Sequence, residues 1–128
     1  PYAITCVSMG NPHCVTFTDN VDTLDINTVG AQMELHPLFP DHVNAEFVQV
    51  LNRAALKMRV WERGSGETLA CGTGACASVV AAVLNGLCDK GSEVCVKLLG
   101  GELNITYFDD RVIMRGGAEV SFTGAVEV

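Results

Sequence analysis

The residues best suited to chemistry form the segment Ala70-Cys71-Gly72-Thr73-Gly74-Ala75, which places a cysteine at the start of an expected helix. The first amides of a helix have no intrahelical acceptor and carry partial positive charge, so they bind anions such as carboxylates. The same field favours a thiolate over a thiol, and we expect it to lower the pKa of Cys71. The segment predicts an activated cysteine beside an anion site, although a buried structural cysteine would give the same local pattern.

Ionic and amide side chains also precede this cysteine. Glu62 and Arg63 end an expected strand just before a glycine loop, where Arg63 could bind a carboxylate and Glu62 an ammonium group. The turn Gly10-Asn11-Pro12-His13 presents an amide and an imidazole, and Asn44 begins another expected strand. Taken singly, these have simpler interpretations as a solvated surface pair, an incidental turn histidine and a turn contact. The Glu62 and Arg63 pair nevertheless suits a zwitterionic ligand.

Strands and two helices must position these groups. Alternating apolar residues and turn signals predict strands at 2–9, 14–18, 43–51, 55–61, 93–99, 102–107, 111–115 and 119–128. In the strand at 55–61 the apolar side chains alternate with Lys57, Arg59 and Trp61, a pattern typical of a sheet with one buried face. A short helix is expected from Asp25 or Asn27 to about 35, before two prolines, and a loop is expected at 64–67.

The second helix, expected at 73–85 and ended by Gly86 in a left-handed cap, is apolar on every side. Ser78 is its only polar residue between Ala75 and Leu84, so the helix must be covered all round. We therefore predict an α+β fold in which an antiparallel β-barrel-like sheet wraps around one central buried helix. Residues 1–128 are expected to form a single domain.

Composition excludes several classes of partner. The net charge of −7 and the absence of basic runs argue against nucleic acid, and no apolar stretch is long enough to span a membrane. The six cysteines include no Cys-x-x-Cys pair and the three histidines lack metal-site spacing, which argues against structural zinc. Reduced thiols in a cytoplasmic protein are expected. The chain begins at Pro1 with no signal segment, and we interpret this start as a cut.

Four motifs, in order and spread over almost the whole chain, carry a family resemblance. They are Gly10-Asn11-Pro12-His13, Asn44-Ala45-Glu46-Phe47, Trp61-Glu62-Arg63-Gly64-Ser65-Gly66-Glu67-Thr68 and Ala70-Cys71-Gly72-Thr73-Gly74. The combination closely resembles the C-terminal half of diaminopimelate epimerase. The Cys-Gly-Thr-Gly segment is also found in proline racemases and related isomerases, whereas the first and third motifs are typical of the diaminopimelate branch.

The resemblance implies a mechanism that uses no cofactor, neither pyridoxal phosphate nor a metal. Two cysteines face each other across the substrate α-carbon, and one removes the proton as thiolate while the other returns a proton to the opposite face. Such an inversion needs an acid and a base on opposite sides of one carbon. The residue roles implied are Cys71 as the second cysteine, Gly72 and Thr73 as carboxylate contacts, Asn11, Asn44, Glu62 and Arg63 as substrate contacts, and His13 and Glu62 as groups that adjust thiol protonation.

The family's first cysteine has no counterpart here, because Cys76 lies about 140° around the helix from Cys71. We therefore expect a catalytic half that is inactive alone and needs an N-terminal half, which was either truncated or is a separate chain. The expected activity interconverts LL- and meso-diaminopimelate in lysine and peptidoglycan precursor synthesis. Alternatives are a related racemase of another amino acid, a non-catalytic domain that binds an amino-acid carboxylate, and a structural module. A homodimer remains open.

Overall fold

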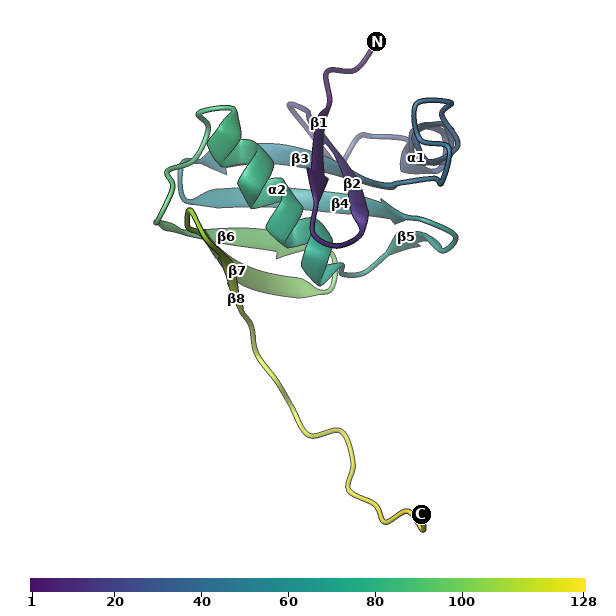
Figure 1. Ribbon diagram of the computed structural model, residues 1–128, viewed down its shortest axis with the longest axis vertical. Coiled ribbons are helices and arrows are strands. Elements are labelled where there is room, and N and C mark those ends of the chain that lie inside the picture. Colours follow the sequence, from purple (N-terminus) through teal and green to yellow (C-terminus); the bar gives the residue numbers. More distant parts are fainter.

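One curved sheet of eight strands forms the framework of the chain, and the computed structural model describes all residues from 1 to 128 (Figure 1). The strand order is β1-β2-β3-β4-β6-β7-β8, with the short β5 paired to β4. The strands are β1 Thr5–Ser8, β2 Pro12–Phe17, β3 Asn44–Asn52, β4 Ala55–Glu62, β5 Gly66–Thr68, β6 Glu93–Leu98, β7 Gly101–Tyr107 and β8 Val112–Arg115. The loop expected at 64–67 is thus partly a strand.

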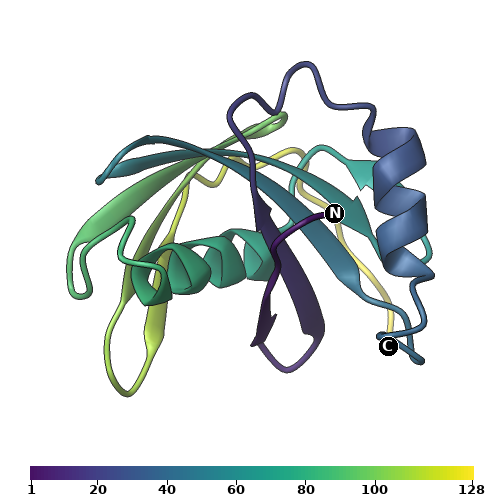
Figure 2. The same cartoon turned by 90° about the horizontal axis from the view of Figure 1, so that it is seen from above.

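Helix α2 (Gly72–Leu84) lies in the hollow of this sheet, which curves around it (Figure 2). Its residues from Gly74 to Ala82 are all buried, and most are small, so that strands can approach the helix closely. Apolar side chains of β3, β4, β6 and β7 pack against it in the main core. The helix ends at Leu84, and Gly86 just beyond it has a φ of 74°, the left-handed cap that the sequence predicts. The α+β fold with a central buried helix is confirmed.

Helix α1 (Ile26–Glu34) covers part of the opposite face of the sheet. Asp25 caps it by accepting a hydrogen bond from the amide of Thr28. Side chains alternate along a strand, so some residues of β3 face away from α2. One of them, Phe47, packs with Ile26 in a second, smaller core. The face of β4 that carries Arg59 is partly covered as well, because Arg59 donates to the carbonyl oxygens of Val21 and Leu24 in the segment before α1.

Two of the strand pairings are parallel, so the expectation of a purely antiparallel sheet is wrong. Strand β2 pairs in parallel with β3, and β4 pairs in parallel with β6. Parallel neighbours need a crossover connection, and here α1 and α2 provide the two crossovers. The first pairing sets His13 opposite Asn44, which brings the starts of β2 and β3 to the same edge of the sheet.

The last segment, beyond β8, extends away from the body of the chain (Figure 1). A strand was expected at 119–128, and this prediction is wrong because no strand of the chain pairs with the segment. Its apolar side chains are largely exposed, as for Val120, Phe122 and Val126. The alternation of apolar residues is present there, but a strand also requires a hydrogen-bonded neighbour.

Neither helix is long and apolar enough to cross a membrane.

Candidate active site

Cys71 occupies the N-cap of α2, where an extended backbone (φ −138°, ψ 110°) leads into the helix. Its sulfur accepts a hydrogen bond from the Gly74 amide at 3.3 Å and lies 3.6 Å from the Thr73 hydroxyl oxygen. The amides of Gly72 and Thr73 belong to the first helical turn, where no intrahelical carbonyl can accept from them. The half-buried thiol therefore lies directly against a group of donors suited to an anion.

The protonation of Cys71 differs from the sequence expectation. Burial raises the pKa of the Cys71 thiol, and the nearby carboxyl groups of Glu62 and Glu46 raise it further. The contacts with Thr73 and Gly74 act in the opposite direction, as expected for donors at a helix start, but burial outweighs them. The expected lowering of this pKa is thus wrong for the chain alone, in which burial raises the pKa of the Cys71 thiol.

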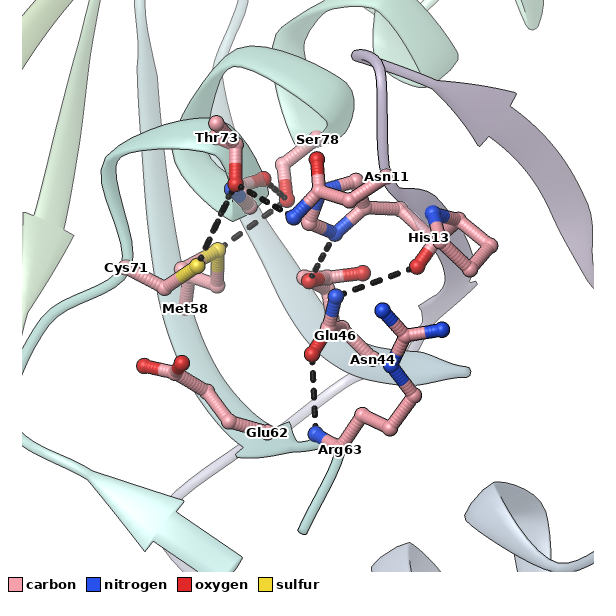
Figure 3. Close-up of polar contacts among 12 residues, drawn as sticks. Asn11, His13, Asn44, Glu46, Met58, Glu62, Arg63, Cys71, Thr73 and Ser78 are labelled. Atoms are coloured by element: carbon pink, nitrogen blue, oxygen red, sulfur yellow. Dashed lines mark hydrogen bonds and ion pairs between the residues drawn. The ribbon is translucent and has the colours of Figure 1, made fainter. Parts of the chain in front are cut away.

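A continuous series of polar contacts connects β2 and β3 to this thiol (Figure 3). The imidazole Nδ1 of His13 lies 2.6 Å from Oε1 of Glu46, and its Nε2 lies 3.1 Å from Oδ1 of Asn11. The amide of Asn11 in turn donates to the Thr73 hydroxyl at 3.2 Å. His13 and Glu46 are almost fully buried, so this histidine is packed beside the candidate site and does not project from an exposed turn.

Glu46 is a further residue of this contact series, one to which the sequence pattern assigned no role. The residue is fully buried beneath the start of α2, and burial raises its pKa to about 7, although the bond from His13 opposes the rise. A signal was present, because Glu46 alternates in phase with Val48 and Val50, which face the main core. A glutamate in the buried phase of a strand requires a partner, and here that partner is His13.

Glu62, Arg63 and Asn44 form the other side of the site. Figure 3 shows the Glu62 carboxylate on the side of Cys71 and the Arg63 guanidinium on the side of Asn44. The Asn44 amide donates to the Pro12 carbonyl oxygen at 3.1 Å, and its oxygen accepts from the Arg63 backbone amide at 2.8 Å. Asn44 thus fixes both the β1–β2 turn and the end of β4. These are the structural turn contacts that the sequence allowed as the simpler role for this residue.

Glu62 and Arg63 differ in the hydrogen bonds that their side chains already make within the chain. The Glu62 carboxylate accepts from the Thr68 hydroxyl at 2.6 Å. The Arg63 guanidinium donates to the Asp41 carbonyl oxygen at 3.2 Å and forms no ion pair. An exposed guanidinium without a carboxylate partner remains available to a ligand.

Glu34, at the end of α1, supports the loop that carries Arg63. Its carboxylate accepts from the Trp61 indole at 2.7 Å and from the Gly64 amide at 2.8 Å. These bonds hold the pKa of Glu34 below its ordinary value. This role could not be predicted from local pattern, because the contact depends on packing between a helix and a strand that are distant in sequence.

Gly74 should be required for the close approach of α2 to Glu46. A methyl group at this position would lie 2.7 Å from Oε1 of Glu46 and 3.2 Å from the Cys71 sulfur. Glu46 is buried and bonded to His13, so it cannot move away freely. We expect Gly74→Ala to lower the free energy of unfolding by about 1–3 kcal/mol, as overpacking does, in urea denaturation of the chain.

Gly72→Ala is the matched control for this substitution. Its new methyl group would meet only the flexible end of Met114, at 3.2 Å. Alanine also favours a helix over glycine by up to about 1 kcal/mol, so the control should be neutral or stabilising. Equal stability of the two variants would contradict the close packing inferred here.

Solvent reaches the site, because Arg63 is exposed and Cys71 and Glu62 are partly exposed. None of the four main surface pockets includes Cys71, Glu62 or Arg63, and one of them borders Asn11 and His13. No group of three or more His, Cys, Asp and Glu side chains is arranged to hold a metal ion. The structure brings together every residue that the sequence singled out, and adds Glu46 and Glu34 to them.

Solved structures with this arrangement define the class of fold. A phenazine biosynthesis protein of the PhzF family from Bacillus anthracis matches with a TM-score of 0.57 and 21% identity, over 82% of this chain and 34% of that one. A predicted epimerase from Pseudomonas aeruginosa matches with a TM-score of 0.56 and 17% identity, over 89% of this chain and 44% of that one. The chain therefore has the α+β fold of these PhzF-like and epimerase-like structures.

Sequence comparison gives the family. The family model described as diaminopimelate epimerase matches residues 5–121. Proteins with the same name are 54% identical in Acetivibrio thermocellus, over 99% of this chain, and 54% identical in Nostoc punctiforme, over 96% of it. This chain belongs to the diaminopimelate epimerase family. It spans about 45% of the length of these relatives.

Proposed function

We propose that this chain is the Cys71-bearing half of a diaminopimelate epimerase, which interconverts the LL and meso forms by moving the α-proton. One observation carries the proposal: Cys71 caps a buried helix, with the free amides of Gly72 and Thr73 beside its sulfur. A carboxylate bound to these amides would place the adjacent α-carbon near the thiol. The amides would also stabilise the negative charge that develops on the substrate when the α-proton leaves.

In this proposal the thiol of Cys71 and a second cysteine from the absent half face opposite sides of the α-carbon. One sulfur, as thiolate, takes the α-proton, and the other, as thiol, gives a proton to the opposite face, so that configuration inverts without net oxidation. The raised pKa of Cys71 supports its role as the proton donor in one direction. In the reverse direction the same group must act as thiolate, which the bound substrate and the enclosed site would have to favour.

The other site residues would bind different groups of the substrate. Arg63 has a guanidinium free for a carboxylate, and Glu62 offers carboxylate oxygens to an ammonium group. Asn11 and Asn44 hold the turn and strand ends and can present their remaining amide hydrogens to the ligand. His13 and Glu62 would influence the protonation of the thiols, and we assign no cofactor to the reaction.

The absent half is part of the proposal. The chain spans about 45% of the relatives' length, its Cys71 is partly exposed, and its last segment exposes Val120, Phe122 and Val126. An N-terminal half that covers the site and pairs with this segment would bury both. Because the reaction needs Cys71 in its reduced form, we place it in the reducing environment of the cytoplasm.

The test compares the isolated chain with a hybrid enzyme, in which this chain is joined to the N-terminal half of the Acetivibrio thermocellus relative. Both are incubated with LL-diaminopimelate in deuterium oxide, and configuration and deuterium content are measured. We expect the hybrid enzyme to invert the α-carbon at about 1–1,000 per second, an ordinary enzymatic rate. The isolated chain should fold but should not invert, because it offers an acid–base group to one face only.

Other outcomes separate the alternatives. Inversion by the isolated chain would overturn the half-site interpretation, because another group or a second copy would then complete the site. A folded hybrid that binds diaminopimelate without exchanging its α-proton would indicate a binding domain instead. A hybrid that inverts a different amino acid and leaves diaminopimelate unchanged would indicate a related racemase.

A further inference from the structure

The geometry points to Glu46 as the positioning residue that orients His13 and Asn11 and thereby holds the Thr73 hydroxyl beside the Cys71 thiol. This inference deepens the proposed function and depends on it only in treating Cys71 as the proton-handling group. Glu46 does not touch the sulfur-bound proton or the ligand position directly; it acts through the residues between.

The hydrogen bonds of Asn11 and His13 run in a defined direction. The amide nitrogen of Asn11 donates to Thr73, so the amide oxygen of Asn11 faces the Nε2 of His13. An oxygen acceptor at that position requires a proton on Nε2. The Nδ1 of His13 then shares the single remaining proton with Oε1 of Glu46, at a separation of 2.6 Å. Glu46 thus fixes both the ring orientation and the protonation of the imidazole nitrogen that faces Asn11.

Burying Glu46 lowers the stability of the fold. Its second carboxyl oxygen, Oε2, is buried with no hydrogen-bond partner, and the residue has no exposed surface. An unpartnered buried carboxylate oxygen destabilises the fold, so an apolar residue in this position would suit packing better. A group that stability does not favour, placed beneath the first turn of the helix that carries Cys71, is better explained by its effect on the site.

Two opposing influences of Glu46 on Cys71 can be separated. The titratable groups that face Glu46 are His13, Glu62, Cys14 and Cys71 itself. A negative charge on Glu46 disfavours the Cys71 thiolate, whereas the Thr73 hydroxyl that Glu46 holds in place favours it. Removing the charge of Glu46 should therefore favour the Cys71 thiolate. Removing the orientation of the Thr73 hydroxyl should disfavour it.

Two substitutions in the 128-residue chain make this separation. In Glu46→Gln the amide can donate to Nδ1 of His13, so orientation is kept while the charge is lost. In Glu46→Leu both are lost, with little change in volume. The measurement is the rate at which iodoacetamide alkylates Cys71, followed by peptide mapping from neutral to alkaline pH. We expect Glu46→Gln to form the thiolate at lower pH than the unsubstituted chain does.

Glu46→Leu should be alkylated about two- to tenfold more slowly than Glu46→Gln, the ratio that corresponds to one hydrogen bond. Ser78→Ala is the control, because Ser78 is buried on the same helix and donates to the Gly74 carbonyl without touching His13. It should leave the alkylation rate unchanged. Asn11→Ala, which interrupts the same series of contacts nearer to Thr73, should reproduce the slow alkylation even if Glu46→Leu does not fold.

Nitrogen-15 spectra of the His13 ring give a second readout. We expect Nε2 to be fully protonated in the unsubstituted chain and in Glu46→Gln, and a mixture of the two tautomers in Glu46→Leu. Equal alkylation rates in the glutamine and leucine variants, or an unchanged tautomer in the leucine variant, would overturn the inference. Neither measurement uses a substrate or an N-terminal half, so failure of the epimerase proposal would leave this test intact.

Discussion

Cys71→Ala should reduce the turnover of the hybrid enzyme by about 10²–10⁴-fold, the range that one positioned acid–base group contributes. The loss should occur in turnover much more than in substrate affinity, because the helix amides that we propose as the carboxylate contacts would remain in place. Cys71 is the N-cap of α2, so the substitution also removes a capping bond from the Gly74 amide. The measurements are steady-state epimerisation in both directions and the thermal stability of each protein.

Cys76→Ala provides the matched control for this experiment. Cys76 lies on the same helix and is buried in the main core, so its replacement tests packing without touching the site. A loss of activity common to both variants would show that helix stability is responsible. Cys71→Ser, which keeps a capping acceptor, should restore stability without restoring turnover, since a hydroxyl is a much weaker acid than a thiol.

Arg63→Met should weaken substrate binding by about 2–5 kcal/mol, which corresponds to a rise in Kd of at least about 30-fold. The Arg63 guanidinium has a backbone carbonyl as its only intrachain partner, so little of the fold depends on it. In the proposed complex with the N-terminal half, removing it would leave a substrate carboxylate unpaired. The measurement is the Kd for diaminopimelate in the hybrid enzyme, together with its KM.

Arg53→Met is the control for nonspecific loss of positive charge. Arg53 pairs with Asp89 at 2.6 Å in an exposed turn, and it belongs to none of the four motifs. Its replacement should leave the Kd unchanged. If Arg63→Met also left the Kd and turnover unchanged, the carboxylate role of Arg63 would be wrong, and the residue would serve only to hold its loop.

The sequence predicted correctly those features that depend on residues close together in the chain. The run of small apolar residues around Ala77 predicts a helix that must be surrounded, and α2 is surrounded. The alternation in β3 and β4 predicts their pairing, because two such strands joined by a short turn can hardly pair otherwise. Cys71 is likewise located by its glycine neighbours at the helix start.

What could not be predicted depends on neighbours distant in the chain. Alternation is the same for a parallel and an antiparallel strand, so it did not reveal that His13 lies opposite Asn44. The same limitation hid the partner of Glu46. The apolar residues at 119–128 alternate as in a strand, but pairing depends on a neighbour that this chain does not supply. The direction of the Cys71 pKa depends on burial and on two carboxyl groups, which local pattern does not report.

The two parallel crossovers also bear on the order in which the chain folds. Asn11 and Thr73, which meet in the site, are 62 residues apart along the chain, and the strands between them pair over long separations. Topologies dominated by such distant contacts fold in milliseconds to seconds, whereas helical bundles fold far faster. During synthesis, the segments that carry Asn11, Asn44 and Arg63 therefore emerge well before the β6 strand that closes the second crossover. The Cys71 thiol acquires these neighbours only once β2, β3 and β4 have come together with the start of α2.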